Sequence, residues 1–378
     1  MSRQTQYSKR SFGVLFSVVS ACFLISSAWA IDAPDYEFDW VTVGDPGNPA
    51  YDGPWLFDRG YFRPVGRVDR VFRVTRTEVT VSQWFEFVQA YAPFYTGNPL
   101  YYTLTSVWIH PDEPNPDGTW TFRMSQGAEN FPTSGGLRFI ARYCNWLHNG
   151  KVNEAWAFED GAYDASVIDA IVAGDESIEG FARRPDAKFW ITSFDEWVKA
   201  MFWDPNKYGP NQGGYWKYPH SKDVPPIPGV ETNAGQWIGY PEQFDFYDVG
   251  GYPDSHSPWG LLDGSGGEDE WMDYEWSPWF GTNNGMVARG TIAFWNRLEL
   301  HDWIGQPPIV FPMNTDKGFR LASVVPCVAD FAVPFGQLDL ADVVAFIQAF
   351  VDGDPAADLA APAGVFDLAD VAAFAGAF

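Results

Sequence analysis

Cysteine, histidine and positive charge are scarce in this chain. Its 378 residues contain only 3 Cys and 5 His, and 24 Lys and Arg stand against 49 Asp and Glu, which gives a formal net charge of -25. A protein this acidic is not expected to bind nucleic acid or an anionic membrane surface through charge. The excess of acid favours solubility in a salty or crowded exterior, and cation binding is the alternative interpretation.

No apolar run is long enough to predict a transmembrane segment. Residues 1–30 instead have the parts of an export signal: a basic start, an apolar run over 11–25 and a small-x-small site at 28–30. We expect cleavage after Ala30, which leaves a secreted or cell-surface protein with a net charge of -28 once the three basic residues of the signal are lost. Residues 19–22 resemble a lipoprotein box, so lipidation at Cys22 is the alternative.

Few cysteines but many aromatic residues remain after cleavage. Cys144 and Cys327 fall in different predicted domains, so no structural disulfide is expected despite an oxidising exterior. The chain holds 19 Trp, 17 Tyr and 31 Phe, which is typical of a loop-rich domain whose core is filled by rings. Residues 208–259 show no sustained period, and the aromatic side chains spaced through them favour packed loops over disorder.

Three amphipathic helices are predicted between residues 80 and 204, because apolar side chains recur there at helical spacing. A capping box of Thr80 and Gln83 opens the first helix, and a box of Ser193 and Glu196 opens the third. Cys144 lies on the apolar face of the second, where a buried and inert thiol is expected. The predicted apolar positions are Val81, Trp84, Phe85 and Val88; Leu137, Ile140, Ala141, Cys144 and Leu147; and Phe194, Trp197, Val198, Met201 and Phe202.

The composition changes abruptly at Cys327. The last 52 residues contain eight Asp and no Lys, Arg, Glu, Trp or Tyr, and they hold two copies of a loop-and-helix repeat 28 residues apart. Neither unit can bury an apolar face alone, so the two helices are expected to pack on each other. Residues 324–378 are therefore predicted to form a small all-α domain. The predicted packing faces are Leu340, Val343, Ile347 and Phe350, and Leu368, Val371, Ala375 and Phe378.

Five motifs in order resemble the sulfatase-modifying-factor (formylglycine-generating enzyme) family. They are TEVTVSQWFEFV at 77–88, ARYCNWL at 141–147, TSFDEWVKA at 192–200, GLLDGSGGEDEW at 260–271, and RG at 289–290 followed by GFRLA at 318–322. The resemblance implies an α+β, loop-rich, C-type-lectin-like fold for residues 31–323.

The resemblance fails at the family's copper site. Catalytic members bind copper through a cysteine pair shortly after the RG motif, and thiolates suit Cu(I). No cysteine occurs between Gly290 and Phe319, so copper is not expected. The segment instead carries residues suited to gripping a ligand, namely Phe294, Trp295, Arg297, His301 and Trp303. Were the chain an enzyme with a non-copper site there, its candidate catalytic residues would be Arg297, Glu299, His301 and Asp302.

Calcium is the metal that the resemblances leave open. The family holds structural calcium near the motif at 260–271, where Glu270 is retained and Gly267 replaces the family's Asn. The tail resembles dockerin-type calcium repeats, which attach exported proteins to a protein partner. Its candidate ligands are Asp330, Asp339 and Asp342 in the first copy, and Asp358, Asp367 and Asp370 in the second. Ala332, Pro334, Ala360 and Pro362 occupy ligand positions of such loops, so a metal-free module is favoured over a calcium-loaded one.

These observations favour a non-catalytic binding protein. It would be exported, would hold a glycan or peptide ligand at residues 289–322, and would dock to a surface or assembly through its tail. One alternative is a formylglycine-generating oxidoreductase acting on sulfatases through a non-copper site. The other is a purely structural scaffold component.

Overall fold

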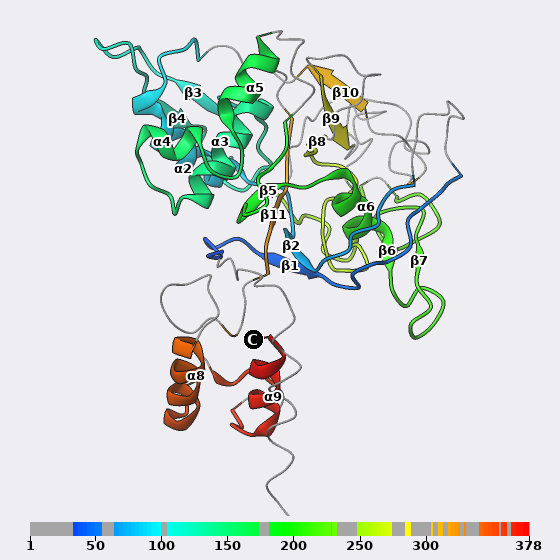
Figure 1. Ribbon diagram of the computed structural model, residues 1–378. Helices are drawn as coiled ribbons and strands as arrows, with labels where there is room; N and C mark the ends of the chain where they lie inside the picture. The colour runs from blue at the N-terminus through cyan, green and yellow to red at the C-terminus, as the bar shows by residue number, and fades with distance from the viewer. Residues whose placement is uncertain are drawn as a thin grey trace, which may run out of the picture. The chain divides into compact units, whose positions relative to one another are not determined.

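The computed structural model describes two compact units of the chain (Figure 1). The described residues are 33–54, 64–99, 104–173, 181–227, 229–232, 248–273, 284–288, 304, 309–312, 317–325, 329, 340–354, 357–360 and 364–377. We call Ala33–Val325 the lectin-like unit, after the family that its sequence resembles, and Pro326–Phe378 the tail. Together they form a mixed α+β, loop-rich fold with helices at its C-terminal end. Within the described residues, no helix has the length and apolarity that crossing a membrane requires.

A four-stranded antiparallel sheet runs through the centre of the lectin-like unit. Its order is β1 (Trp40–Val43), β2 (Phe72–Thr75), β11 (Leu321–Ser323) and β5 (Phe189–Ile191). Ala322 pairs with Val74 on one side and with Trp190 on the other. The last strand of the unit therefore lies between two strands that come much earlier in the chain.

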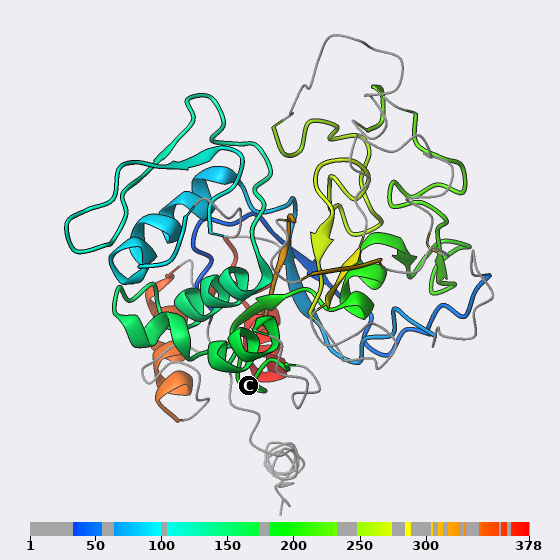
Figure 2. The ribbon, with the colours of Figure 1, turned by 90° about the horizontal axis from the view of Figure 1, so that it is seen from above.

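One side of this sheet carries most of the helices. They are α2 (Val81–Tyr91), the 3-10 turn η2 (Ala92–Phe94), α3 (Leu137–His148), α4 (Ala155–Glu159) and α5 (Ala165–Val172), with the hairpin of β3 (Ile109–Pro111) and β4 (Phe122–Met124) beside them. Figures 1 and 2 show this group on the opposite side of the sheet from the remaining elements of the same unit.

Rings fill the core between these helices and the sheet, as the composition predicts. Trp84 meets Tyr143 and Phe319 edge-on, with ring centroids 5.5 and 5.6 Å apart. The Trp84 indole also donates to the carbonyl of Leu104 at 2.9 Å, so its polar edge is satisfied inside the core.

The predicted helix starts are confirmed. Thr80 and Gln83 cap α2 reciprocally, and Ser193 and Glu196 do the same for α6 (Phe194–Phe202). All five apolar positions predicted for α3 are buried, including the free thiol of Cys144. Phe85 of α2 is half-buried and packs against the core, while Phe87, which was not predicted, is buried because it faces the rings of α3. In α6, Phe194 is half-buried against the core, and the other four predicted positions are buried.

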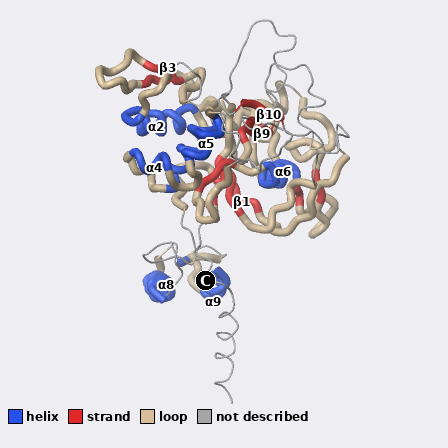
Figure 3. Tube along the Cα trace, turned by 45° about the horizontal axis from the view of Figure 1, so that its top comes forward, coloured by secondary structure: helices blue, strands red, loops and turns tan. Residues whose placement is uncertain are grey.

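The other side of the sheet is built mostly from loops, drawn in tan in Figure 3. Its regular elements are α6, the paired β6 (Trp203–Asp204) and β7 (Gly214–Tyr215), and a second sheet of three strands. That sheet has the order β10 (Ile309–Pro312), β9 (Asn284–Ala288) and β8 (Glu270–Trp271). The described part of residues 208–259 contains β7 and turns, in keeping with packed loops.

The tail consists of α8 (Leu340–Asp352) and α9 (Leu368–Ala377). Phe346 and Phe374, which are 28 residues apart, stack with their ring centroids 4.0 Å apart. The predicted packing faces are confirmed in part, because Val343 and Phe350 pack against this core. Leu340 and Leu368 were wrongly assigned to these faces, since they are 74% and 79% exposed, and Phe378 lies outside the described residues. Asp342 and Asp370 are buried together with the two stacked rings.

Candidate functional site

The predicted ligand-binding and catalytic residues lie outside the described residues. These are Phe294, Trp295, Arg297, Glu299, His301, Asp302 and Trp303, and the tail residues Asp330 and Asp339 lie outside as well. Of the other predicted metal ligands, Glu270, Asp342, Asp358, Asp367 and Asp370 are described. The scaffold on either side of the predicted binding segment is described too.

Strands β9 and β10 fix both ends of that segment. β9 ends at Ala288, β10 begins at Ile309, and Ile309 pairs with Val287. The two strands that flank residues 289–308 therefore pair with each other, so Ala288 and Ile309 lie at neighbouring positions of the sheet. Ile304 is buried, and its N–H donates to the carbonyl of Lys217 at 2.9 Å. Binding residues of proteins often lie between such paired strands.

A fully buried arginine joins this frame to the central sheet. Arg320 contacts Glu270 of β8 through Nε at 2.6 Å, and its two Nη atoms donate to the carbonyls of Arg76 and Leu262 at 2.7 and 2.6 Å. The other carboxylate oxygen of Glu270 accepts from the Trp197 indole at 2.7 Å.

Glu270 was predicted as a cation ligand, and these contacts fit a different role. Both of its oxygens are engaged by donors, and Gly267 brings no side-chain ligand beside it. Among the described residues, no three His, Cys, Asp or Glu side chains gather as a metal site. The residues present near 260–271 do not fit the calcium that the family resemblance implies.

A second carboxylate explains why residue 267 is glycine. Glu78 is buried, and its Oε1 accepts from the N–H of Glu268 at 3.0 Å. A Cβ at Gly267, whose φ is 72°, would lie 2.0 Å from that oxygen. Glu78 Oε2 makes no hydrogen bond within the described residues and lies 3.9 Å from Arg320. Burial raises the pKa of Glu78 well above its usual value, and the neighbouring Asp263 adds to the rise.

Two small cavities meet at Asp263 and Tyr252. One is lined by Glu78, Asp248 and Gly267 among others, and the second by His220 and Glu231, each of about 10 Å³. Such a space holds about one water molecule.

His220 is the chemically unusual residue in the second cavity. It is buried, neither ring nitrogen makes a hydrogen bond within the described residues, and Nε2 lies 3.9 Å from Glu231. Burial lowers the pKa of His220 to about 4, so the ring is neutral at pH 7. No sequence pattern indicates this environment, because no regular spacing links His220 to its neighbours.

In the tail, the described Asp side chains bind backbone amides. Asp370 accepts from the N–H groups of Asp367 and Ala360 at 2.9 and 2.8 Å, and these bonds lower its pKa. Asp367 accepts from the N–H of Ala369 at 2.7 Å, and Asp358 accepts from that of Gly364. These carboxylates tie the repeat's loop to the start of α9, as capping residues do.

Comparisons with known proteins give similarity of fold only. No model of a known protein family matches the chain. No curated protein matches it either. The chain is similar to the crystal structure of CarF, with a TM-score of 0.47 and 18% identity over 76% of this chain and 98% of CarF. It is also similar to Treponema denticola variable protein 1, with a TM-score of 0.47 and 14% identity over 76% of this chain and 95% of that one.

Proposed function

We propose that this chain is an exported binding protein. Its lectin-like unit is a C-type-lectin-like domain that holds a glycan or peptide ligand, and its tail docks the protein to a protein partner at a surface or in an assembly. No catalytic step is assigned to it.

The pairing of β9 with β10, the two strands that flank residues 289–308, is the observation that carries the proposal. The flanking strands β9 and β10 pair with each other, and Arg320 binds Glu270 of the neighbouring strand β8. Its sequence supplies three flat aromatic side chains, Phe294, Trp295 and Trp303, together with the hydrogen-bonding groups of Arg297 and His301. Aromatic anchors with a few polar groups are typical of binding sites for sugars and peptides.

The tail supports the docking part of the proposal through its exposed apolar side chains. Leu340, Val344, Ile347 and Val351 follow one another along α8 at helical spacing, and all are exposed. Leu368 repeats the exposure of Leu340 in the second copy. An apolar stripe of this kind on a small acidic module is a docking surface for another protein.

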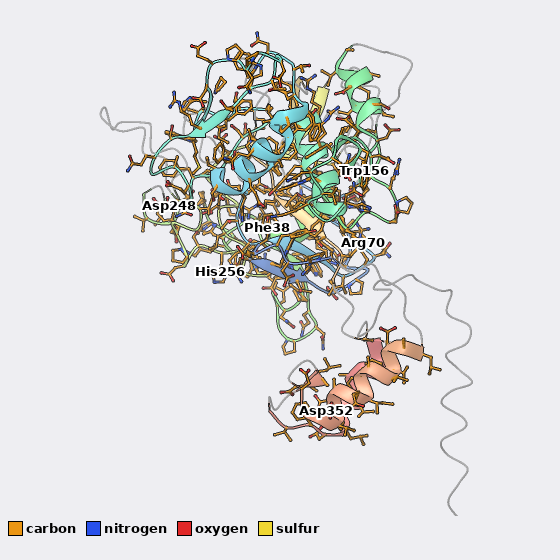
Figure 4. All side chains as sticks on the ribbon, turned by 90° about the vertical axis from the view of Figure 1, so that its left-hand side faces the viewer. Phe38, Arg70, Trp156, Asp248, His256 and Asp352 are labelled. Carbon is orange, nitrogen blue, oxygen red and sulfur yellow. The ribbon has the colours of Figure 1, made fainter. Side chains whose placement is uncertain are left out.

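Binding of the mature chain, residues 31–378, to arrays of glycans and peptides tests whether it has such a ligand. We expect a defined ligand class to bind, and Trp295→Ala and Trp303→Ala to weaken it by about tenfold or more. The matched control is Trp156→Ala on α4, an indole that is 54% exposed and lies across the unit from Asp248 (Figure 4). Absence of any bound glycan or peptide, or equal binding by all three variants, would overturn the proposal.

The same preparation separates binding from oxidase activity. A Cys-x-Pro-x-Arg peptide incubated with the mature chain is expected to keep its mass. Conversion of its thiol to an aldehyde would show the alternative function instead.

A further inference from the structure

A groove on the helical side of the lectin-like unit has the size and lining of a ligand site. It lies between the end of α2 with η2 and the β3–β4 hairpin, and its volume is about 360 Å³, within the range of small-molecule sites. All its lining residues are described: Gln89, Ala92, Pro93, Asn115, Asp117, Thr119, Trp120, Thr121 and Phe122.

The hairpin loop that forms one wall is held in shape by its own backbone. The backbone N–H of Asp112 donates to the carbonyl of Thr121 at 2.9 Å, and the backbone N–H of Asn115 donates to that of Thr119 at 2.8 Å. Gly118, with φ 84°, closes the turn by donating to the carbonyl of Asn115 at 3.0 Å. A loop with this many internal bonds is preformed, so a ligand does not have to order it on binding.

The apolar part of the groove is a half-buried indole. The Trp120 ring donates through Nε1 to the carbonyl of Gly97 at 3.1 Å, which fixes its orientation. Phe122 is buried beside it, and Ala92 and Pro93 supply further apolar surface from η2. A fixed flat ring is suited to the C–H face of a sugar ring.

The polar part consists of amide and carboxylate groups. Asp117 accepts both the N–H and the hydroxyl of Thr119, at 3.0 and 2.6 Å, through the single oxygen Oδ1. The hydroxyl bond, and then the amide bond, lower the pKa of Asp117, so the group is ionised at neutral pH. Asn115 Nδ2 donates to Thr119 Oγ1 at 3.0 Å, and the side-chain Oδ1 of Asn115 is a hydrogen-bond acceptor.

We propose that this groove binds a neutral sugar residue of a glycan. The Trp120 indole stacks on the ring's C–H face, and Asp117, Asn115 and Gln89 bond to its hydroxyl groups. The ionised Asp117 disfavours acidic sugars. The groove lies apart from β9 and β10, because Figures 1 and 2 show the β3–β4 hairpin on the opposite side of the central sheet from these two strands.

Saturation-transfer NMR and calorimetry on the mature chain test the site. The probes are neutral gluco-, galacto- and manno-configured oligosaccharides at millimolar concentration, with sialylated and sulfated oligosaccharides as acidic counterparts. We expect at least one neutral probe to bind and the acidic counterparts to bind more weakly. Trp120→Ala is expected to weaken binding about tenfold, and Asp117→Asn to weaken it about threefold.

Two controls keep the outcomes distinct. Trp156→Ala removes another exposed indole of the helical side and is expected to bind like the wild type. Asp117 is exposed, so Asp117→Asn tests the groove even if Trp120→Ala fails to fold. No binding of any neutral probe, or undiminished binding by both groove variants, overturns the inference. Binding lost in Trp303→Ala but kept in Trp120→Ala also overturns it, while supporting the proposed function.

Discussion

At the scale of single residues, Arg320 connects several separate parts of the lectin-like unit, although it lies just before the short strand β11. It bonds to Glu270 of β8 and to the carbonyls of two separate loops, and Glu270 in turn accepts from Trp197 of α6. A guanidinium taken wholly out of water is stable only because each of these acceptors is in place.

Removing this guanidinium is expected to destabilise the protein strongly. Arg320→Met leaves Glu270 buried without its cation, so the free energy of unfolding should fall by about 3–5 kcal/mol. Arg67→Met, which breaks the exposed pair with Asp69, should change it by less than about 1 kcal/mol. Urea denaturation of both variants measures the difference. Equal stability of the two would show that the buried ion pair is not needed.

The buried ring of His220 leads to a prediction about how the stability of the protein changes at acidic pH. Its folded pKa of about 4 lies below the ordinary value of 6.5, so the unfolded chain takes up this proton first as the pH falls. The contribution of His220 to stability is therefore complete above pH 6.5 and is lost between pH 6.5 and 4.

The variant His220→Gln removes this titration. Across that window the stability difference between wild type and variant should change by roughly 3 kcal/mol, with the wild type losing more. Denaturant unfolding at a series of pH values between 7 and 4 measures it. Parallel curves for the two proteins would contradict the buried neutral ring.

At the scale of elements, the helices are fixed at their first turns by side chains near in sequence. The capping box of α6 also reaches outside the helix, since Glu196 Oε2 accepts from the N–H of Ser193 at 2.9 Å and from the Trp190 indole at 3.0 Å. One residue pair thus starts a helix and attaches it to β5.

Ser193→Ala removes the side-chain cap of α6 and is expected to lower the free energy of unfolding by about 1 kcal/mol. Ser166→Ala at the start of α5 is the control, because there Asp164 accepts the capping N–H bond and Ser166 only donates its hydroxyl to that exposed carboxylate. Thermal unfolding of both variants compares them. A control as destabilised as Ser193→Ala would mean that general helix propensity, and not the cap, sets the effect.

The scale of elements also shows how far the sequence could predict the structure. Helix starts and the α3 face follow from local pattern and were predicted. The inward faces of the tail helices were predicted only in part, because Phe346 and Leu340 are both apolar and only the partner helix decides which of them is buried. Glu78, Asp263 and His220 could not be predicted to lie near one another, since loops far apart in sequence bring them together. The Trp120 groove was missed for the same reason.

At the scale of the whole molecule, the lectin-like unit and the tail have separate cores. The larger core runs through the lectin-like unit, and the smaller one is centred on Phe346 and Phe374. In the described part of the tail, the carboxylate of Asp370 accepts hydrogen bonds from the backbone N–H groups of Ala360 and Asp367. These bonds hold the loop to the helix without a bound cation.

Separate cores are expected to melt separately. Deleting residues 326–378 should remove one calorimetric transition and move the midpoint of the other by no more than about 2 °C. Adding calcium to the mature chain should leave the tail's transition in place. A calcium-dependent rise in that transition would show that the repeats load the ion after all.

The position of β11 has a consequence for how the protein is made. β2 and β5 cannot complete the sheet until residues 321–323 arrive between them, so synthesis of nearly the whole lectin-like unit precedes closure. Pairings between such distant segments make folding slow. During that delay both strands present open edges, which invite association with other chains.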